Sequence, residues 1–288
     1  MSYIIASDLN QALQILRDSK GQARVIAGAT DLFLQTLPAE LVDLAGLYET
    51  TQLEETGGLL SIGSAVTHAS AARSLLIRSQ AAALAEACAM IGSPQVRNIG
   101  TIGGNVANAA PAADAAVALV ALGAKAVITD IAGQTRVEAV EELYAGYNRS
   151  TIDSSSEIIG RLLFKSCAAG EGSAFMRFAP RRALALPLVN AAARVRVSGR
   201  RIEAVRLVAA PVKPAPTRLF ETEALLQEVI PGPEIWPKVE EAAAEVEVRG
   251  SMLRCSEQYR RHLVGTLAGR VLKEAYQRAC AAEGGETR

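Results

Sequence analysis

The chain has 288 residues, enough for one or two domains with a large core, and half of them are hydrophobic although only 4% are aromatic. Thirty basic and thirty acidic residues balance, which argues against a nucleic-acid-binding protein because such proteins carry a basic excess. The first residues lack the pattern of a signal peptide, and no apolar run reaches the roughly 18 residues of a membrane span. We therefore expect a cytoplasmic protein without a membrane span.

Cysteine and histidine are too few and too scattered to predict a metal centre. Iron–sulfur and structural zinc sites need clustered thiolates or imidazoles, and four single cysteines with two separate histidines offer no such cluster. Buried structural thiols are the expected role of the cysteines. The residues in question are Cys88, Cys167, Cys255, Cys280, His68 and His262. We interpret His68, a lone histidine near the start of a helix, as structural.

A short strand, a tight loop and a brief helix are predicted near the start of the chain. The strand covers Arg24 to Ala27, the loop holds Gly28 to Asp31, and the helix runs through Leu34. This order is one in which backbone amides can meet a phosphate. Thr30 or Asp31 would also serve as an ordinary helix cap, so both readings stay open.

Two hairpins and a buried helix are predicted next. Leu53–Glu55 and Leu59–Gly63 pair across Gly57-Gly58, and Lys125–Asp130 pairs with Gln134–Val140 around Ala132-Gly133. Between them, Gln80 to Ile91 is an alanine-rich helix that we expect in the core.

A glycine- and asparagine-rich stretch, Val96 to Asp114, is the most distinctive part of the sequence. Glycine permits close approach of a ligand, and exposed amides in such turns bind anions, although a plain surface turn would have the same composition. Pro111 suits the first turn of the apolar helix predicted over 112–122. Asp114 is the only charge of this helix; it either complements the helix dipole or accepts hydrogen bonds from a ligand.

The remainder predicts strands followed by helices. Glu157–Lys165 and Ser173–Phe178 are expected as edge strands, and a domain boundary is placed near Pro180. A further hairpin is predicted from 188–197 and 202–209. Helices are expected over 217–229, 234–247 and 256–282, with 283–288 frayed.

Three segments in order resemble the FAD-binding subunit of the molybdenum hydroxylases, the xanthine dehydrogenase and carbon monoxide dehydrogenase family. They are VIAGATDL (Val25–Leu32), QVRNIGTIGGNVANAAPAAD (Gln95–Asp114) and YRRHLVGTLAGRVL (Tyr259–Leu272). The resemblance implies an α+β fold: a PCMH-type, vanillyl-alcohol-oxidase-like FAD-binding domain over 1–178, made of α/β subdomains at about 1–55 and 56–178. A smaller α+β domain similar to the carbon monoxide dehydrogenase flavoprotein C-terminal domain would cover 179–288.

The resemblance also implies which residues bind FAD. The first loop and the second loop would line the pyrophosphate and ribityl chain, and Asp114 would accept hydrogen bonds from cofactor hydroxyls. Ile91, and Ile158 or Ile159, would lie near the flavin ring, and Arg177 would stand where relatives carry a lysine that stabilises reduced flavin. Arg181 and Arg182 match the family too. The implied loop residues are Val25, Ile26, Ala27, Gly28, Ala29, Thr30, Asp31, Leu32, Thr101, Ile102, Gly103, Gly104 and Asn105.

One departure from the family pattern and two absent residue types bear on how FAD is bound and on catalysis. The family usually has a second glycine where Ala29 stands, and no histidine that could tether FAD lies in the first loop, so binding should be noncovalent. No general base or nucleophile is evident, so no catalytic residue is assigned.

The resemblance implies partners as well. The molybdopterin and the 2Fe-2S clusters would lie on an iron–sulfur subunit and a molybdenum subunit of a heterotrimer, and electrons would leave from FAD to NAD or a quinone-like acceptor. Two alternatives stay open, a free-standing flavin oxidoreductase of the same fold and a flavin-free interaction subunit.

Overall fold

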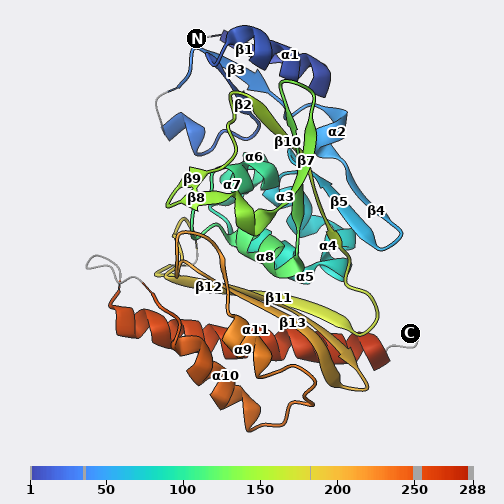
Figure 1. The fold of residues 1–288 in the computed structure, drawn as a ribbon, viewed down its shortest axis with the longest axis vertical. Helices are drawn as coiled ribbons and strands as arrows, with labels where there is room; N and C mark the ends of the chain where they lie inside the picture. Colours follow the sequence, from blue (N-terminus) through green and yellow to red (C-terminus); the bar gives the residue numbers. More distant parts are fainter. Residues whose placement is uncertain (1, 35–36, 182, 249–254, 285–288) are drawn as a thin grey trace.

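The computed structural model describes residues 2–34, 37–181, 183–248 and 255–284. Figure 1 shows a small α/β unit at one end, a five-stranded sheet beside a cluster of short helices in the middle, and a second sheet backed by one long helix at the other end. No helix in these ranges is long and apolar enough to cross a membrane.

The first unit is a parallel three-stranded sheet with one covering helix. Its strands are β1 (Ser2–Ile5), β2 (Ala23–Ile26) and β3 (Glu40–Asp43), in the order β1-β3-β2. Helix α1 (Leu9–Ser19) buries Leu13 and Leu16 against the sheet. The first loop therefore starts at the carboxyl end of β2, as predicted, and leads into the short helix η1 (Leu32–Leu34). Short helix α2 (Tyr48–Thr51) connects to the next sheet.

The five-stranded antiparallel sheet has the order β4-β5-β10-β6-β7. Both predicted hairpins are confirmed, β4 (Leu53–Thr56) with β5 (Leu59–Gly63) and β6 (Lys125–Asp130) with β7 (Thr135–Ala139). The prediction of an edge strand at β10 (Glu157–Lys165) is wrong, because β10 joins the two hairpins and pairs with β5 on one side and β6 on the other.

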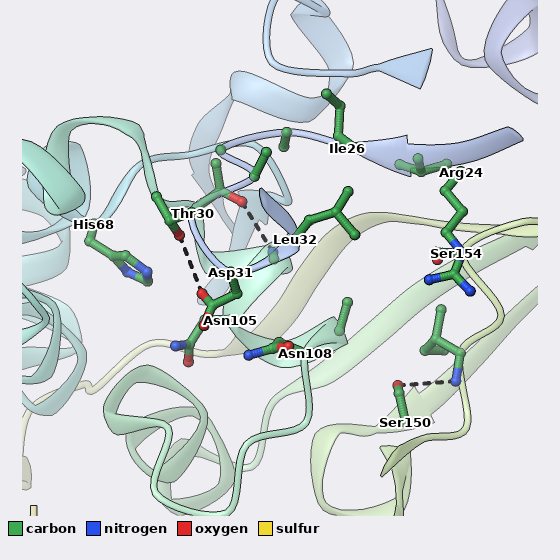
Figure 2. A pocket seen from close by; sticks show the side chains of 18 of the residues that line it. Arg24, Ile26, Thr30, Asp31, Leu32, His68, Asn105, Asn108, Ser150 and Ser154 are labelled. Atoms are coloured by element: carbon green, nitrogen blue, oxygen red, sulfur yellow. Dashed lines mark hydrogen bonds between the residues drawn. The ribbon is translucent and has the colours of Figure 1, made fainter. Parts of the chain in front are cut away.

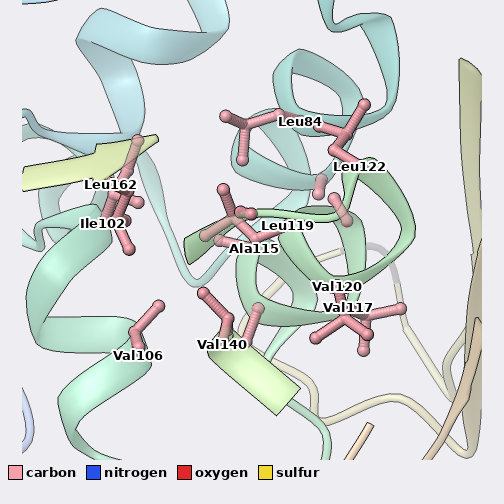
Figure 3. Packing of buried hydrophobic residues seen from close by; sticks show 14 of the residues in the cluster. Leu84, Ile102, Val106, Ala115, Val117, Leu119, Val120, Leu122, Val140 and Leu162 are labelled. Carbon is pink, nitrogen blue, oxygen red and sulfur yellow. The ribbon is translucent and has the colours of Figure 1, made fainter. Parts of the chain in front are cut away.

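Short helices fill the space beside this sheet, and the most buried of them is α8 (Asp114–Leu122). Every residue of α8 is buried, which confirms the prediction of a core helix (Figure 3). The helix begins at Asp114, two residues later than the predicted start at residue 112. The helices before it are α3 (His68–Arg73), α4 (Leu75–Gln80), α5 (Ala82–Met90), α6 (Pro94–Ile99) and α7 (Ile102–Ala107). After the sheet hairpin come η2 (Val140–Leu143), β8 (Tyr144–Gly146) and β9 (Arg149–Ser150).

The second sheet has the order β11-β12-β13-β14 and lies between α11 and the α5–α8 layer. Side chains alternate between the two cores: Phe175 and Ala192 pack toward the α8 cluster, and Ala174 and Ala193 pack toward α11. The strands are β11 (Glu171–Phe178), β12 (Val189–Ser198), β13 (Arg201–Ala210) and β14 (Thr217–Arg218).

After β14 the described residues form the helices α9 (Phe220–Ala224), α10 (Ile235–Ala244) and α11 (Glu257–Gly284). The predicted helix over 217–229 is mostly wrong, since its start is β14 and its helical part is only α9. The predicted frayed end, 283–288, lies partly outside the described residues. Because β11 pairs with β12 along its whole length, the sheet pairing favours a domain boundary before β11, within 166–170, rather than near Pro180.

Candidate cofactor-binding site

A cavity of about 310 Å³ lies where the first loop, the helices α6 and α7, and the β8–β9 hairpin come together (Figure 2). Segments separated by more than a hundred residues form it. Its described lining residues are Arg24 to Leu32, His68, Ile91, Val96, Thr101, Gly104, Asn105, Ala107, Asn108, Asn148, Ser150, Ile152 and Ser154. The structure thus brings the first loop, most of the second loop and Ile91 together, as the sequence predicted.

The first loop presents free backbone donors. Among the described residues, the amides of Gly28, Ala29, Thr30 and Asp31 donate no hydrogen bond. Ala29 has φ = +51°, in the left-handed region, whereas its neighbours Gly28 and Thr30 do not have a positive φ. Such alternation of backbone conformation is typical of the amide nests that bind anions. A Cβ on Gly28 would lie 2.2 Å from the Ile99 carbonyl oxygen, which explains why glycine is required there. The loop can therefore hold a negatively charged group.

The second loop forms a wall, and its amides from Ile102 to Asn105 already donate hydrogen bonds within the protein. The Thr101 hydroxyl accepts from the Gly104 amide at 3.1 Å and caps α7, and the Gly103 amide donates to the Ser64 carbonyl at 2.8 Å. The Asn105 Oδ1 accepts from the Ala116 amide at 3.2 Å, which ties this wall to α8. This part of the site supplies shape and side chains, while the first loop supplies free amides.

Several polar lining residues were missed by the sequence reasoning. Arg24 precedes the first loop and adds a positive charge, and Asn108 lies within the glycine-rich stretch. Asn148, with φ = +51°, and Ser150 come from the β8–β9 hairpin, and Ser154 follows it. Asn108 could have been found from its place in the motif. The hairpin residues carry no local signal, because only the fold brings them to the cavity.

His68 is a further lining residue that the sequence did not assign to the site. It is 3% exposed and lines the cavity, and its Nδ1 lies 3.6 Å from the Sγ of Cys88. Burial, with a smaller effect of the Arg97 charge, lowers the pKa of His68 to about 4. The imidazole is therefore neutral near pH 7.

Two predicted site residues, Ile102 of the second loop and Ile158 near the flavin ring, fall elsewhere. Ile102 is fully buried in the core around α8. Ile158 packs into the core of the first unit, whereas its neighbour Ile159 lines an apolar cavity of about 90 Å³ next to the main one, together with Gly103. Side chains alternate along a strand, so only one of the two isoleucines can face the site, and it is Ile159.

Asp114 and Arg177 do not line the cavity but bind each other. The Arg177 Nη1 donates to the Asp114 Oδ2 at 2.5 Å, with both side chains about 5% exposed, and the Asn190 Nδ2 donates to the Asp114 Oδ1 at 2.6 Å. Protein groups thus supply the donors that the sequence analysis expected from cofactor hydroxyls. Burial raises the pKa of Asp114, and Arg177 and Asn190 act in the opposite direction.

Arg177 remains a neighbour of the cavity. Its guanidinium also donates to the Met90 carbonyl at 3.0 Å, one residue before the lining residue Ile91, and to the Ala185 carbonyl at 2.7 Å. Arg181 makes local contacts with the Ala183 and Leu184 carbonyls, and the predicted match at Arg182 lies outside the described residues.

Comparison with known proteins places this architecture in one family. Residues 1–164 match the FAD binding domain in molybdopterin dehydrogenase, and residues 174–275 match the CO dehydrogenase flavoprotein C-terminal domain. The chain is 27% identical over 282 residues to a xanthine dehydrogenase FAD-binding subunit of Escherichia coli O157:H7, covering 95% of each chain. It is 28% identical to the nicotine 6-hydroxylase medium subunit of Paenarthrobacter nicotinovorans, covering 95% of this chain and 96% of that one.

Solved structures agree on the fold. The chain superposes on quinoline 2-oxidoreductase from Pseudomonas putida 86 with a TM-score of 0.87 and 27% identity, over 97% of this chain and 98% of that chain. It superposes on carbon monoxide dehydrogenase from Hydrogenophaga pseudoflava with a TM-score of 0.89 and 24% identity, over 96% and 98%.

The fold and the cavity define a flavoprotein of the oxidoreductase class. The chain belongs to the family of FAD-binding subunits of molybdopterin dehydrogenases, the xanthine and carbon monoxide dehydrogenase type.

The cavity fits the cofactor of this family on its own geometry. Four free amides in a row and a tight glycine suit a pyrophosphate, the polar hairpin wall suits hydroxyl groups, and Ile91 and Ile159 offer apolar contacts for a ring.

Proposed function

We propose that this chain is the electron-transferring flavin subunit of a molybdenum-containing dehydrogenase complex, and that FAD binds noncovalently in the cavity of Figure 2. In this proposal the substrate is oxidised on a molybdenum-cofactor subunit. Electrons pass through iron–sulfur clusters of a further subunit to this chain and leave to NAD or another acceptor. Bound FAD would supply the redox chemistry, and the protein would bind it and adjust its potential.

The observation that carries the proposal is the row of free amides in the first loop, in a chain of this family. Gly28, Ala29, Thr30 and Asp31 offer their N–H groups to an anion, and Arg24 adds a positive charge to the lining of the same cavity. The names of several relatives describe subunits or medium chains of dehydrogenases and hydroxylases, which supports a multi-subunit assembly. Their substrates differ, so the substrate class of this complex is left unassigned.

Each part of the cavity has a distinct part in the proposal. The first loop holds the pyrophosphate, the second loop and the β8–β9 hairpin enclose the ribityl and adenosine portions, and Ile91 with Ile159 borders the ring. Arg177 is largely neutralised by Asp114, so its effect on reduced flavin would be smaller than that of an unpaired cation. Its contact with the Met90 carbonyl positions the segment that carries Ile91.

The test separates a relay from an independent enzyme. The chain, copurified with its iron–sulfur and molybdenum subunits, should show flavin reduction when substrate is added, and the isolated chain should not. Rapid-mixing absorbance measures both. Fast flavin bleaching of the isolated chain by purines, aldehydes or N-heteroaromatics would contradict the relay and favour a free-standing oxidoreductase.

A further inference from the structure

His68 is held beside both cofactor loops by its backbone. Thr67 forms a β-bridge with Thr101, and its hydroxyl accepts from the Ser70 amide at 3.2 Å to cap α3. The His68 amide donates to the Gly100 carbonyl at 3.0 Å. The start of α3 is thus fixed against the start of α7, and the first side chain of α3 enters the cavity wall.

The His68 ring faces the first loop. In Figure 2 it points toward the space between Thr30, Asp31 and Asn105. A Cβ on Gly100 would lie 3.3 Å from the His68 Cδ2, the carbon bonded to Nε2, and 3.5 Å from the Thr30 hydroxyl. The edge of the imidazole that carries Nε2 and the Thr30 hydroxyl of the first loop therefore border the same position beside Gly100. Among the described residues, Nε2 has no hydrogen-bond partner.

The other ring nitrogen is occupied by Cys88. The thiol is fully buried, its Sγ lies 3.6 Å from Nδ1, and burial raises the pKa of Cys88 well above its usual range. A thiol that stays protonated can donate its S–H to Nδ1, which makes Nδ1 the acceptor. In a neutral imidazole the ring proton then resides on Nε2.

We propose that His68 is a cofactor-binding residue whose Nε2–H donates to an oxygen of the pyrophosphate held by the first loop, and that Cys88 is a positioning residue that selects this tautomer. The inference rests on the proposed function, since it requires an anionic ligand in the cavity. It adds a neutral ring donor to the free backbone amides of the first loop. A neutral donor binds phosphate oxygens without the cost of burying another charge.

The chain suits a direct spectroscopic test because it has only two histidines, and His262 is exposed on α11. Ring ¹⁵N labelling of histidine gives one set of signals for each, and His262→Gln assigns them. In the free protein we expect the His68 pattern of an Nε2–H tautomer. FAD should then shift the Nε2 resonance of His68 and leave His262 in place, and riboflavin, which lacks phosphate, should not shift it.

The outcomes separate this inference from the function on which it rests. FAD binding in calorimetry with an unchanged His68 spectrum would overturn the role of His68 and leave the proposed function standing. No FAD binding in calorimetry would contradict the proposed function itself, and this inference with it.

Variants provide a second measurement. His68→Leu should weaken FAD binding about 10- to 100-fold, the usual loss for a hydrogen bond to a charged group, and His68→Gln should recover part of it. Cys88→Ala should move the tautomer toward Nδ1–H in the ¹⁵N spectrum, and Cys88→Ser should restore Nε2–H. Circular dichroism confirms folding of each variant. Equal FAD affinity for His68→Leu and the parent, or an unchanged tautomer in Cys88→Ala, would overturn the inference.

Discussion

The carboxylate of Asp114 and the guanidinium of Arg177 meet at 2.5 Å in a buried ion pair that joins the first turn of α8 to strand β11 of the second sheet. Asn190 on β12 completes the set by donating to the other carboxylate oxygen. This contact links the core helix of the FAD-binding domain to two strands of the C-terminal sheet. The ion pair therefore connects the two domains. It also lies near the cavity, because Arg177 donates to the carbonyl of Met90, the residue before the lining residue Ile91.

Removing one partner of this pair should destabilise the protein strongly. Arg177→Met leaves the Asp114 carboxylate buried without its cation, and we expect a loss of about 3–5 kcal/mol in the free energy of unfolding. Urea unfolding followed by circular dichroism measures it. The double variant Asp114→Asn with Arg177→Met should lose less than the sum of the two single variants. Additive losses would show that the pair is not energetically coupled.

The first loop should tolerate glycine at residue 29 but not alanine at residue 28. Ala29 has φ = +51°, so Ala29→Gly should remove about 1 kcal/mol of backbone strain and keep FAD affinity. Gly28→Ala places a Cβ 2.2 Å from the Ile99 carbonyl and should abolish FAD retention by moving the loop. Calorimetric titration of both variants with FAD is the measurement. Equal effects of the two substitutions on FAD affinity would contradict a close backbone approach at Gly28.

The two glycines of the second loop should differ in the same way. A Cβ on Gly103 would lie 2.4 Å from the Ser64 Cβ inside the protein, so Gly103→Val should destabilise the fold itself. A Cβ on Gly104 would approach only the Thr101 hydroxyl, at 2.9 Å, and Gly104 lines the cavity. Gly104→Val should therefore remain folded by circular dichroism and lose FAD. Retention of FAD by Gly104→Val at the level of the parent would return this loop to a purely structural role.

The protein without cofactor should lose stability in mild acid because of His68. Its pKa in the folded state is about 4, below the ordinary 6.5, with burial as the main cause and the Arg97 charge as the second. The unfolded chain therefore takes up the proton first as the pH falls. The stabilisation is complete above pH 6.5 and is lost between pH 6.5 and 4, by up to about 3 kcal/mol.

The variant His68→Phe isolates this contribution, because it removes the titrating ring and leaves Cys88 and Arg97 in place. Urea unfolding at pH 7 and pH 4.5 should show a smaller acid loss in the variant than in the parent. Identical acid losses in the two proteins would show that His68 does not titrate between these values.

Much of the fold follows from local sequence signals. The two hairpins flanking β10 were predicted from paired glycine or turn residues between alternating strands, and α8 from its unbroken apolar run. The central position of β10 could not be predicted in the same way. Its partners, β5 and β6, lie about a hundred and about thirty residues earlier in the chain, so no local signal reports the pairing.

Some residues of the site also have a local sequence signal, and others are brought together only by the fold. The glycine loops carry their own signal, since tight turns and close approach demand particular residues. The donors to Asp114 could not be predicted, because Arg177 and Asn190 reach it from strands of the other domain. His68 was interpreted as structural because nothing in the sequence around a lone histidine indicates that its side chain lines a cavity. The choice between Ile158 and Ile159 needed the register of β10, which contains a bulge at this point.

Noncovalent FAD in this cavity is the central claim, and acid precipitation of the purified chain tests it most directly. The supernatant and the pellet are examined by absorbance, and the released flavin is identified by chromatography against FAD and FMN. We predict FAD in the supernatant, close to one per chain, and none from Gly104→Val purified in parallel. Flavin that stays with the pellet would contradict noncovalent binding, and a parent protein that carries no flavin and takes up none from added FAD would contradict the assignment of the cavity.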